Sequence, residues 1–327
     1  NVIDLQNSIS NRQGYTHIKG TLGSSLAFIS SAIFSETEEL QLFMFQDKEE
    51  AVYFFNTLEN INEGNKKKKF YFYPASYKRP YQIESTDNAN VLLRTEVLNA
   101  ISKNRRNSVV VSYPEAMVEK VVTKKSLRKS TLDIHVGDKY SIDFLNELFI
   151  ESHFHKVDYV YEPGQFSVRG GIVDVFSFSF DYPFRIEFFG DEVDSIRSFN
   201  IADQLSINTH KNITITPNVQ AELLQESRTS FFEFISQKSV IWLHAFSTSK
   251  KKTENGFDKA LYAFNQLEKE LKRLPPNELY INSIEFESEL KQFTGVEFGN
   301  EIYFSNETVI FHQSPQPSFN KKFDLLA

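Results

Sequence analysis

Residues 162–199, EPGQFSVRGGIVDVFSFSFDYPFRIEFFGDEVDSIRSF, decide the architecture of the middle of this chain. Short runs of alternating apolar and polar residues are separated there by turns that contain glycine or proline, a pattern typical of antiparallel strands. The turns fall at Pro163-Gly164, Gly170-Gly171, Tyr182-Pro183 and Gly190-Asp191. The expected strands are residues 159–161, 165–169, 172–176, 184–189 and 193–199, and a helix is expected before them at 142–151. We therefore predict an antiparallel meander.

On both sides of this meander the pattern changes to helices that alternate with short apolar strands. Asp47 is a candidate N-cap for a helix at 48–60, and SVVVS at 108–112 is expected to be a strand buried on both faces. Further helices are expected at 24–34, 86–99 and 257–274, and further strands at 40–45, 70–73 and 239–246. This order is typical of a parallel sheet covered by helices.

The predicted fold class is therefore α/β, with one parallel-sheet domain split by an inserted β-rich α+β domain. Residues 1–115 and 204–327 are expected to form the two parts of the α/β domain, the second with helical additions. Residues 116–203 are expected to form the insertion.

The composition is that of a globular protein with an acidic balance. Of 327 residues, 40% are hydrophobic and 24% are charged, and the net charge of −7 argues against broad, sequence-independent binding to nucleic acid. The sequence has no cysteine, which excludes disulfides and thiolate metal sites. No apolar run approaches the roughly 20 residues that span a bilayer, so we expect a cytoplasmic protein without a membrane partner. Because the chain begins at Asn1 and stops just after Leu325-Leu326, we expect it to be part of a longer protein.

A glycine-containing loop near the start of the chain has the outline of a phosphate-binding loop. Gly20 and Gly23 precede a predicted helix, followed by Ser25, Leu26 and Ala27. In a working loop, a lysine that contacts phosphate and a hydroxyl residue that binds Mg²⁺ stand where this chain has Leu26 and Ala27. Neither residue can hold charge or metal. The loop is therefore either a degenerate nucleotide site or an ordinary turn between strand and helix.

Two blocks of the central stretch, Glu162–Phe176 and Tyr182–Arg197, resemble the signature shared by UvrB and the transcription-repair coupling factor family. In these families the signature lies in the inserted domain that binds UvrA, domain 2 of UvrB. The order of motifs is also similar along nearly the whole chain, from the Gly20 loop to Pro315–Asn320. The resemblance implies that 1–115 and 204–327 form a degenerate RecA/helicase-like domain.

The degenerate loop favours the coupling factors over UvrB, which carries Lys and Thr at the positions of Leu26 and Ala27. A second difference lies at the end of the predicted strand 239–246, where His244 and Ala245 replace the Asp-Glu pair that serves Mg²⁺ in UvrB. Both differences are similar to those in the UvrB-like amino-terminal module of the coupling factor, its domains 1A, 2 and 1B.

The resemblance implies a docking module without enzymatic activity or cofactor, which recruits UvrA in transcription-coupled nucleotide excision repair. ATP, Mg²⁺, DNA and RNA polymerase would be bound by motor and polymerase-binding domains of the longer protein, which resembles an ATP-dependent DNA translocase. The resemblance also implies that the UvrA-binding face is covered by other parts of the intact protein.

The residues implied for UvrA binding are Arg169, Arg185 and Phe189. Strand alternation puts Arg185 and Phe189 on one face, opposite the apolar residues of the same strand. Arginine and aromatic side chains are common anchors of protein interfaces, and each guanidinium can pair with a carboxylate through two bonds. The structural alternative is that Phe189 packs under the loop at Pro163-Gly164 and that Arg185 pairs with neighbours of Glu187.

Other functions remain open from the sequence. One is a helicase-related module that binds nucleotide without hydrolysing it, and another is a UvrB-like module that binds DNA through lysines at 66–69 and Lys124-Lys125. The histidines His135, His153 and His155 could begin a metal site, but they lack a carboxylate at clear ligand spacing. We assign no catalytic residue and no metal ligand.

Overall fold

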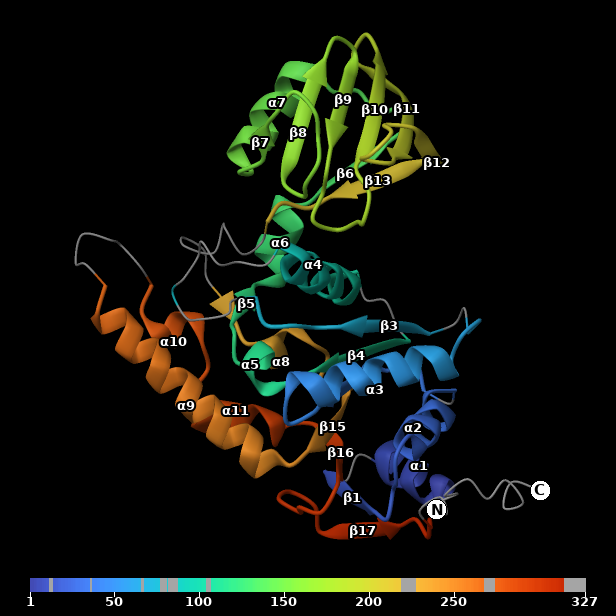
Figure 1. The fold of residues 1–327 in the computed structure, drawn as a ribbon, viewed down its shortest axis with the longest axis vertical. Coiled ribbons are helices and arrows are strands. Elements are labelled where there is room, and N and C mark those ends of the chain that lie inside the picture. Colours follow the sequence, from blue (N-terminus) through green and yellow to red (C-terminus); the bar gives the residue numbers. More distant parts are fainter. Residues whose placement is uncertain are drawn as a thin grey trace, which may run out of the picture.

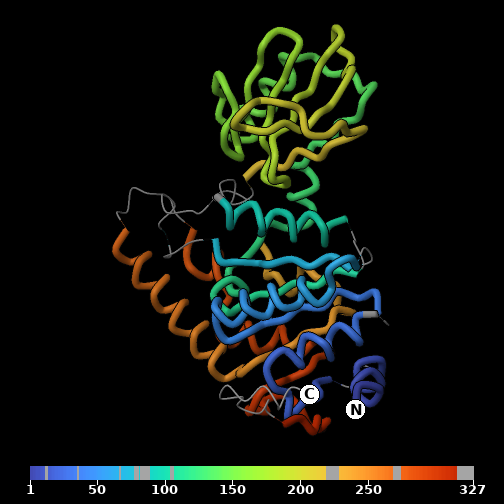
Figure 2. The backbone as a smooth tube through the Cα atoms, turned by 45° about the vertical axis from the view of Figure 1, so that its right-hand side comes forward, coloured from blue at the N-terminus to red at the C-terminus, as the bar shows by residue number. Residues whose placement is uncertain are grey.

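The computed structural model describes residues 1–11, 14–35, 37–65, 68–76, 81, 88–103, 107–218, 228–267 and 274–314. The chain forms two bodies, which stand one above the other in Figure 1. The inserted body comprises residues 132–216, and the large body comprises the described residues on either side of it. Figure 2 shows from a second direction that the inserted body stands at one end of the molecule.

The large body is built on a parallel sheet of seven strands in the order β17-β1-β16-β15-β2-β4-β3. Its first part contains α1 (Val2–Asn11), β1 (Tyr15–Lys19), α2 (Ser25–Ser35), β2 (Gln41–Met44), α3 (Lys48–Ile61), β3 (Lys69–Phe72), α4 (Asn88–Ser102), β4 (Ser108–Ser112), α5 (Pro114–Met117), β5 (Val121–Val122) and α6 (Lys124–Ser130). Its second part contains β14 (Arg228–Thr229), α8 (Phe231–Phe234), β15 (Val240–His244), α9 (Phe246–Asn265), α10 (Pro276–Leu279), α11 (Ser283–Leu290), β16 (Thr294–Phe298) and β17 (Glu307–Ile310). The predicted α/β class is confirmed.

Local sequence explains most of these elements. The Asp47 carboxylate accepts a hydrogen bond from the Glu50 amide at the start of α3, as expected of an N-cap. Strand β4 is buried along its whole length, as its run of β-branched residues predicts. The sole tryptophan, Trp242 of β15, stacks on Phe43 of β2 with ring centres 4.9 Å apart and anchors the middle of the sheet. In the described part of the chain, no helix is both long and apolar enough to cross a membrane.

The inserted body contains a six-stranded sheet in the order β12-β11-β10-β9-β8-β7. Its elements are β6 (Leu132–His135), α7 (Ile142–Glu151), β7 (His155–Lys156), β8 (Gln165–Arg169), β9 (Ile172–Val175), β10 (Phe184–Phe189), β11 (Glu192–Phe199), β12 (Ser206–His210) and β13 (Asn212–Ile215). Strands β8 to β12 are antiparallel neighbours, which confirms the predicted meander. Leu145 and Phe149 of α7 join the core formed by one face of this sheet.

Two features of the inserted body differ from the sequence prediction. Residues 159–161 form no strand, because the Gln165 side chain accepts hydrogen bonds from the amides of Tyr161 and Glu162 and holds this segment as a loop. The insertion also continues past residue 203, since β12 pairs with β11 in the six-stranded sheet and β13 pairs with β6 in a separate two-stranded sheet. Strand β12 is largely exposed and polar, so hydrophobic alternation gave no signal for it.

The segment before the insertion belongs to the large body. Met117, Val121 and Leu127 lie in the same hydrophobic cluster as the parallel sheet, and β5 pairs with β14. The inserted body thus begins at β6, some residues after the expected boundary at 116.

A buried ion pair fixes α4 to the large body. Arg94 Nη2 lies 3.1 Å from Glu119 Oε2, and their side chains are 0% and 8% exposed. Arg94 also donates to the carbonyl oxygens of Pro74 and Ala116, and Glu119 accepts from the amide and hydroxyl of Ser76. Breaking such a pair on one side is costly, because the other charge stays buried.

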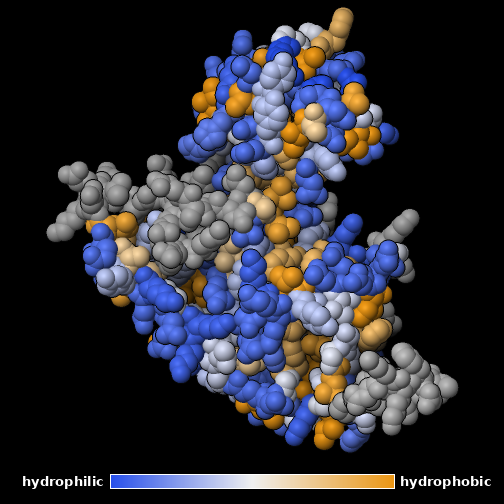
Figure 3. Space-filling view, viewed as in Figure 1, coloured by the Kyte–Doolittle hydropathy of each residue, from blue (hydrophilic) through white to orange (hydrophobic). Residues whose placement is uncertain are grey.

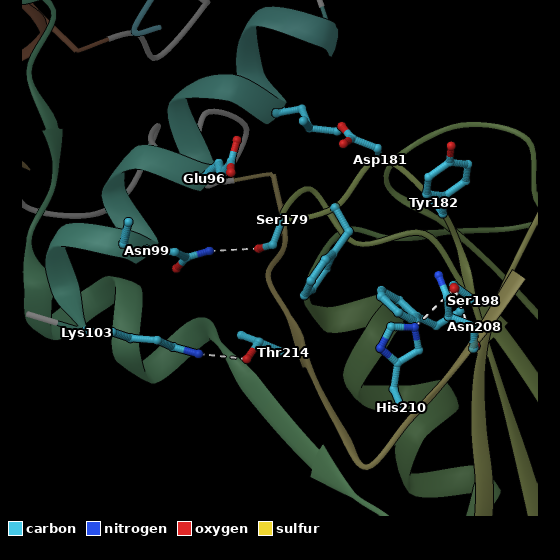
Figure 4. Close-up of a pocket in the computed structure, with 14 residues that line it drawn as sticks. Glu96, Asn99, Lys103, Ser179, Asp181, Tyr182, Ser198, Asn208, His210 and Thr214 are labelled. Carbon is cyan, nitrogen blue, oxygen red and sulfur yellow. Dashed lines mark hydrogen bonds between the residues drawn. The ribbon is translucent and has the colours of Figure 1, made fainter. Parts of the chain in front are cut away.

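Helix α4 also carries the inserted body. Asn99 Nδ2 donates to Ser179 Oγ at 2.7 Å and to Thr216 Oγ1 at 3.0 Å, and Lys103 Nζ donates to Thr214 Oγ1 at 2.7 Å. Figure 4 shows the bonds to Ser179 and Thr214 at the edge of a pocket of about 300 Å³ that lies between α4 and the inserted body. The orientation of the insertion therefore depends on polar side chains of α4.

The substitution Glu119→Gln tests the importance of the buried ion pair. It leaves the charge of Arg94 buried without a carboxylate, so we expect the free energy of unfolding of the large body to fall by about 3 kcal/mol. Urea unfolding followed by the fluorescence of Trp242, which is buried in this body, measures the change. The control is Glu115→Gln, whose exposed pair with Lys252 at 3.8 Å should contribute less than about 0.5 kcal/mol. Equal unfolding midpoints for the two variants would contradict this assignment.

Candidate partner-binding face

The six-stranded sheet has one apolar face and one polar face. Phe166, Val173, Ile186 and Ile196 lie on the apolar face and are fully buried. On the other face, the strand register places Asp174 of β9 directly opposite Ser167 of β8 and Arg185 of β10, and places Arg185 opposite Arg197 of β11. We call this second surface the outer face and define it by Arg169, Asp174, Arg185, Glu187, Phe189 and Arg197.

Asp174 is the centre of the outer face. Its carboxylate is only 1% exposed and accepts from Arg185 through two bonds, Nε to Oδ1 at 2.8 Å and Nη2 to Oδ2 at 2.9 Å. Arg169 Nη2 donates to the same Oδ2. The hydrogen bonds to Asp174 raise the pKa of the Arg185 guanidinium, so it stays charged at any physiological pH. One buried carboxylate thus holds two arginines, whose side chains are 37% exposed for Arg169 and 19% exposed for Arg185.

Aromatic rings fix the planes of both guanidinium groups. The guanidinium carbon of Arg185 lies 4.6 Å from the centre of the buried Phe199 ring, and that of Arg169 lies 5.0 Å from the ring of Tyr159. Arg169 also donates to the carbonyl oxygen of Asp158. The two side chains are therefore held in one conformation before any partner binds.

Phe189 lies at the end of β10 and is 85% exposed. Its neighbour Phe188 packs on the apolar core, and alternation along β10 puts Phe189 on the outer face. A register shift in β11 opposite Glu187 and Phe188 lets the hairpin continue to Phe189. The Phe189 ring is uncovered in the free chain and is therefore accessible to a partner.

The structure places Arg169, Arg185 and Phe189 on one face of the sheet, and Phe189 does not pack under the loop at Pro163-Gly164. Phe178, not Phe189, packs against Gly164, where an added Cβ would lie 2.8 Å from its ring. Arg185 pairs with Asp174, while Glu187 pairs with Arg197. Sequence reasoning missed the role of Asp174, although an acidic residue in the middle of an otherwise apolar strand was the signal that could have found it.

Figure 3 shows hydrophilic and hydrophobic residues interspersed over the visible surface of the inserted body, without a single large apolar patch. The outer face agrees with that character, because it carries both charged groups and one exposed ring. Such a mixed surface is typical of partners that bind and release, rather than of permanently buried interfaces.

The glycine loop connects β1 to α2, as predicted, and its two glycines have positive φ values of 82° for Gly20 and 53° for Gly23. The Leu22 amide donates to the Ser25 hydroxyl at 2.9 Å and to Gln313 Oε1 at 2.8 Å. A Cβ at Gly20 would lie 2.1 Å from the carbonyl oxygen of Phe311. The segment after β17 therefore lies against this loop, and its Gln313 side chain accepts a hydrogen bond from the Leu22 amide.

The residues at the lysine and hydroxyl positions of the loop face the protein interior. Leu26 is 7% exposed and Ala27 is 0% exposed, and both belong to the core of the large body. They contribute packing where a working loop would present charge and a metal ligand.

His244 and Ala245 lie at the carboxyl end of β15. His244 Nδ1 lies 2.8 Å from Glu50 Oε2, and its ring stacks on Phe298 with centres 5.1 Å apart. Ala245 has φ 48° and ψ 61° and turns the chain into α9. This end of the strand is held by a ring stack and a turn, and it presents no pair of carboxylates.

The remaining predicted sites are separated by the structure. His153 has φ 59° in the turn after α7, so it does not share a strand face with His155 of β7, and His135 pairs with Asp138. No group of three potential metal ligands occurs among the residues that the structure describes. Of the lysine run at 66–69, Lys66 and Lys67 lie outside the described residues, and Lys68 is only 7% exposed and donates to Asn107.

Comparison with known proteins supports the resemblance found in the sequence. Residues 132–220 match the family model of the UvrB interaction domain. The transcription-repair-coupling factor of Bacillus subtilis is 28% identical over 72% of this chain, and that of Myxococcus xanthus is 32% identical over 47% of it. The UvrABC system protein B of Onion yellows phytoplasma is 26% identical over 61% of the chain. The match spans 20% and 13% of the lengths of the two coupling factors and 31% of the UvrABC protein.

The matched range starts at β6 and includes every residue of the outer face. Residues 132–220 thus match the UvrB interaction domain family, and most of the chain is similar to transcription-repair-coupling factors.

Proposed function

We propose that this chain is a docking module that binds UvrA through the outer face of its inserted body and so acts in nucleotide excision repair. The observation that carries the proposal is the pair of arginines held on Asp174, on the same face of the sheet as Phe189, which is 85% exposed. The similarity to coupling factors supports a role that is linked to transcription. Translocation on DNA and binding to RNA polymerase would belong to other parts of a longer protein.

The geometry suits recognition of a partner that carries carboxylates around an apolar pocket. Arg169 and Arg185 keep donor groups beyond those used by Asp174, and their fixed planes reduce the entropy lost on binding. Burying the ring of Phe189 would contribute about 2 to 3 kcal/mol. Arginine and exposed aromatic side chains on one face are the usual composition of an interface hot spot.

The large body would serve as a scaffold. We propose that its parallel sheet is a degenerate RecA/helicase-like domain, in which Leu26 and Ala27 of the glycine loop and His244 and Ala245 of β15 replace the groups that bind phosphate and Mg²⁺. The burial of Leu26 and Ala27 supports this view, because both side chains pack in the core and neither offers a polar group to a phosphate or to Mg²⁺. The proposed module would thus neither hydrolyse ATP nor need a cofactor.

Isothermal titration calorimetry of the chain with purified UvrA tests the docking proposal. We expect the parent to bind and the triple variant Arg169→Ala/Arg185→Ala/Phe189→Ala to lose at least about 100-fold in affinity, because hot-spot residues each contribute about 1 to 2 kcal/mol or more. Circular dichroism confirms that each variant is folded.

A matched control removes two cations and one exposed ring from other sites of the inserted body, as Phe144→Ala/Lys156→Ala/Lys211→Ala. Phe144 lies on α7, which packs on the apolar face of the sheet, and Lys156 bonds to Asn146 of the same helix. This variant should bind UvrA like the parent. Equal loss in both triple variants, or no binding by the parent, would refute the assignment.

Asp174→Asn tests whether the two arginines must be held in place. The amide keeps the size of the side chain but removes the charge and one acceptor oxygen, so the fork of Arg185 loses a bond. We expect the affinity for UvrA to fall about tenfold at unchanged secondary structure, as measured by calorimetry. The control Asp194→Asn changes an exposed carboxylate on β11 and should leave the affinity unchanged. A variant at Asp174 that binds as tightly as the parent would show that the pairing is only structural.

Nucleotide binding without hydrolysis is the second candidate function, favoured by the preserved outline of the glycine loop. The contact of Gln313 with the Leu22 amide speaks against it. We expect millimolar MgATP to shift the melting temperature by less than about 1 °C, since a ligand stabilises only the state that it binds. A concentration-dependent rise of several degrees, in the parent or after Gln313→Ala, would establish residual binding.

A further inference from the structure

The short helix α6 lies at the join between the two bodies (Figure 1), and four of its seven residues are cations. Lys124, Lys125, Arg128 and Lys129 stand at positions i, i+1, i+4 and i+5, so they share one side of the helix. Leu127 points the other way, is 1% exposed and packs in the core of the large body. We call this row of four cations the α6 basic face.

The α6 basic face is unfavourable for the helix that carries it. Arg128 and Lys129 in the last turn suit the negative end of the helix dipole, but Lys124 and Lys125 occupy the first turn, where cations are disfavoured. The pairs Lys124/Arg128 and Lys125/Lys129 also place like charges four residues apart. Helix stability therefore does not explain why four cations are gathered here.

The surroundings of α6 do not neutralise these charges. No ion pair found in the described part of the chain involves any of the four cations. The neighbouring groups are the hydroxyl and carbonyl of Ser102, which accept from Arg128, and the ring of Phe234, which lies 5.5 Å from Lys124 Nζ. Asp133 pairs instead with Lys103 at 3.5 Å. Burial and the charge of Arg128 lower the pKa of Lys124, which agrees with unbalanced positive charge.

A polyanion is the partner that this arrangement fits. Three of the four cations are lysines, which act as point charges toward phosphate rather than as planar forks for carboxylates. Helix α6 itself contains no aromatic residue, and the ring of Phe234 beside Lys124 is 1% exposed, so this helix offers no platform for stacking of unpaired bases. Contacts to the backbone of a duplex need neither base readout nor stacking.

We propose that the α6 basic face binds the phosphate backbone of duplex DNA without sequence preference. The net charge of −7 does not oppose this local role, because the four cations of α6 form a local positive patch that attracts phosphates at short range. Lys125, Arg128 and Lys129 are exposed and can reach phosphates from one side. This contact would hold DNA at the join between the bodies and does not depend on the UvrA proposal.

Fluorescence anisotropy of a labelled random-sequence DNA duplex, titrated with the full chain at several salt concentrations, tests the proposal. With about three phosphates contacted, the affinity should fall about 40-fold between 50 and 200 mM NaCl. The double variant Lys125→Gln/Lys129→Gln should reduce the slope of log affinity against log salt by about 2 and weaken binding to all sequences alike.

The matched control is Lys251→Gln/Lys259→Gln, which removes two exposed lysines from α9 in the large body and changes the net charge equally. It should bind DNA with the slope of the parent. The proposal is overturned if the parent does not bind duplex DNA at 50 mM salt, or if both double variants weaken DNA binding equally. UvrA is absent from this experiment, so the result does not depend on the docking face.

Discussion

The buried ion pair between Arg94 and Glu119 is the interaction on which the arrangement of the two bodies depends. It fixes α4 in the large body, and the same helix holds the inserted body through Asn99 and Lys103. Arg94 Nη1 donates to two backbone carbonyl oxygens and Glu119 accepts from Ser76, which offsets part of the cost of burying the two charges. The outer face would thus be presented by a rigid support, with one helix linking the two cores.

The outer face also depends on a buried charge that is paired with charges of opposite sign. A buried carboxylate, Asp174, is tolerated in the inserted body because two guanidinium groups pair with it. The stabilisation is mutual, since the carboxylate and the rings of Tyr159 and Phe199 remove the freedom of both arginines. The arginine side chains are thereby held as fixed donors on the same face of the sheet as the exposed ring of Phe189. In our account this preorganised cluster is the recognition element, and the large body is its scaffold.

Much of the fold could be predicted from the sequence because its signals are local. The alternation in 165–169 and 184–189, the turn glycines between them and the N-cap Asp47 each depend on a few neighbouring residues, and the structure has strands or a helix there. The polar strand β12 and the loop at 159–161 were missed because distant pairings and side-chain bonds determine them.

In the site, too, local signals could be read from the sequence and long-range pairings could not. The face that carries Arg185 and Phe189 follows from strand alternation, whereas the role of Asp174 needs the register between β9 and β10. The closure of the glycine loop by Phe311 and Gln313 joins residues almost 300 positions apart, and no local pattern indicates it. Long-range packing therefore supplied what the sequence could not, namely which charges pair and which surfaces stay open.

Amide hydrogen–deuterium exchange of the chain, free and saturated with UvrA, tests the central claim most directly because it locates the contact without altering any residue. The account predicts slower exchange confined to the segments around the outer face, at 158–161, β8, β10 and the β10–β11 turn, with no change in the glycine loop or β15. Protection centred on the large body, or on α7 at the opposite face of the sheet, would contradict it.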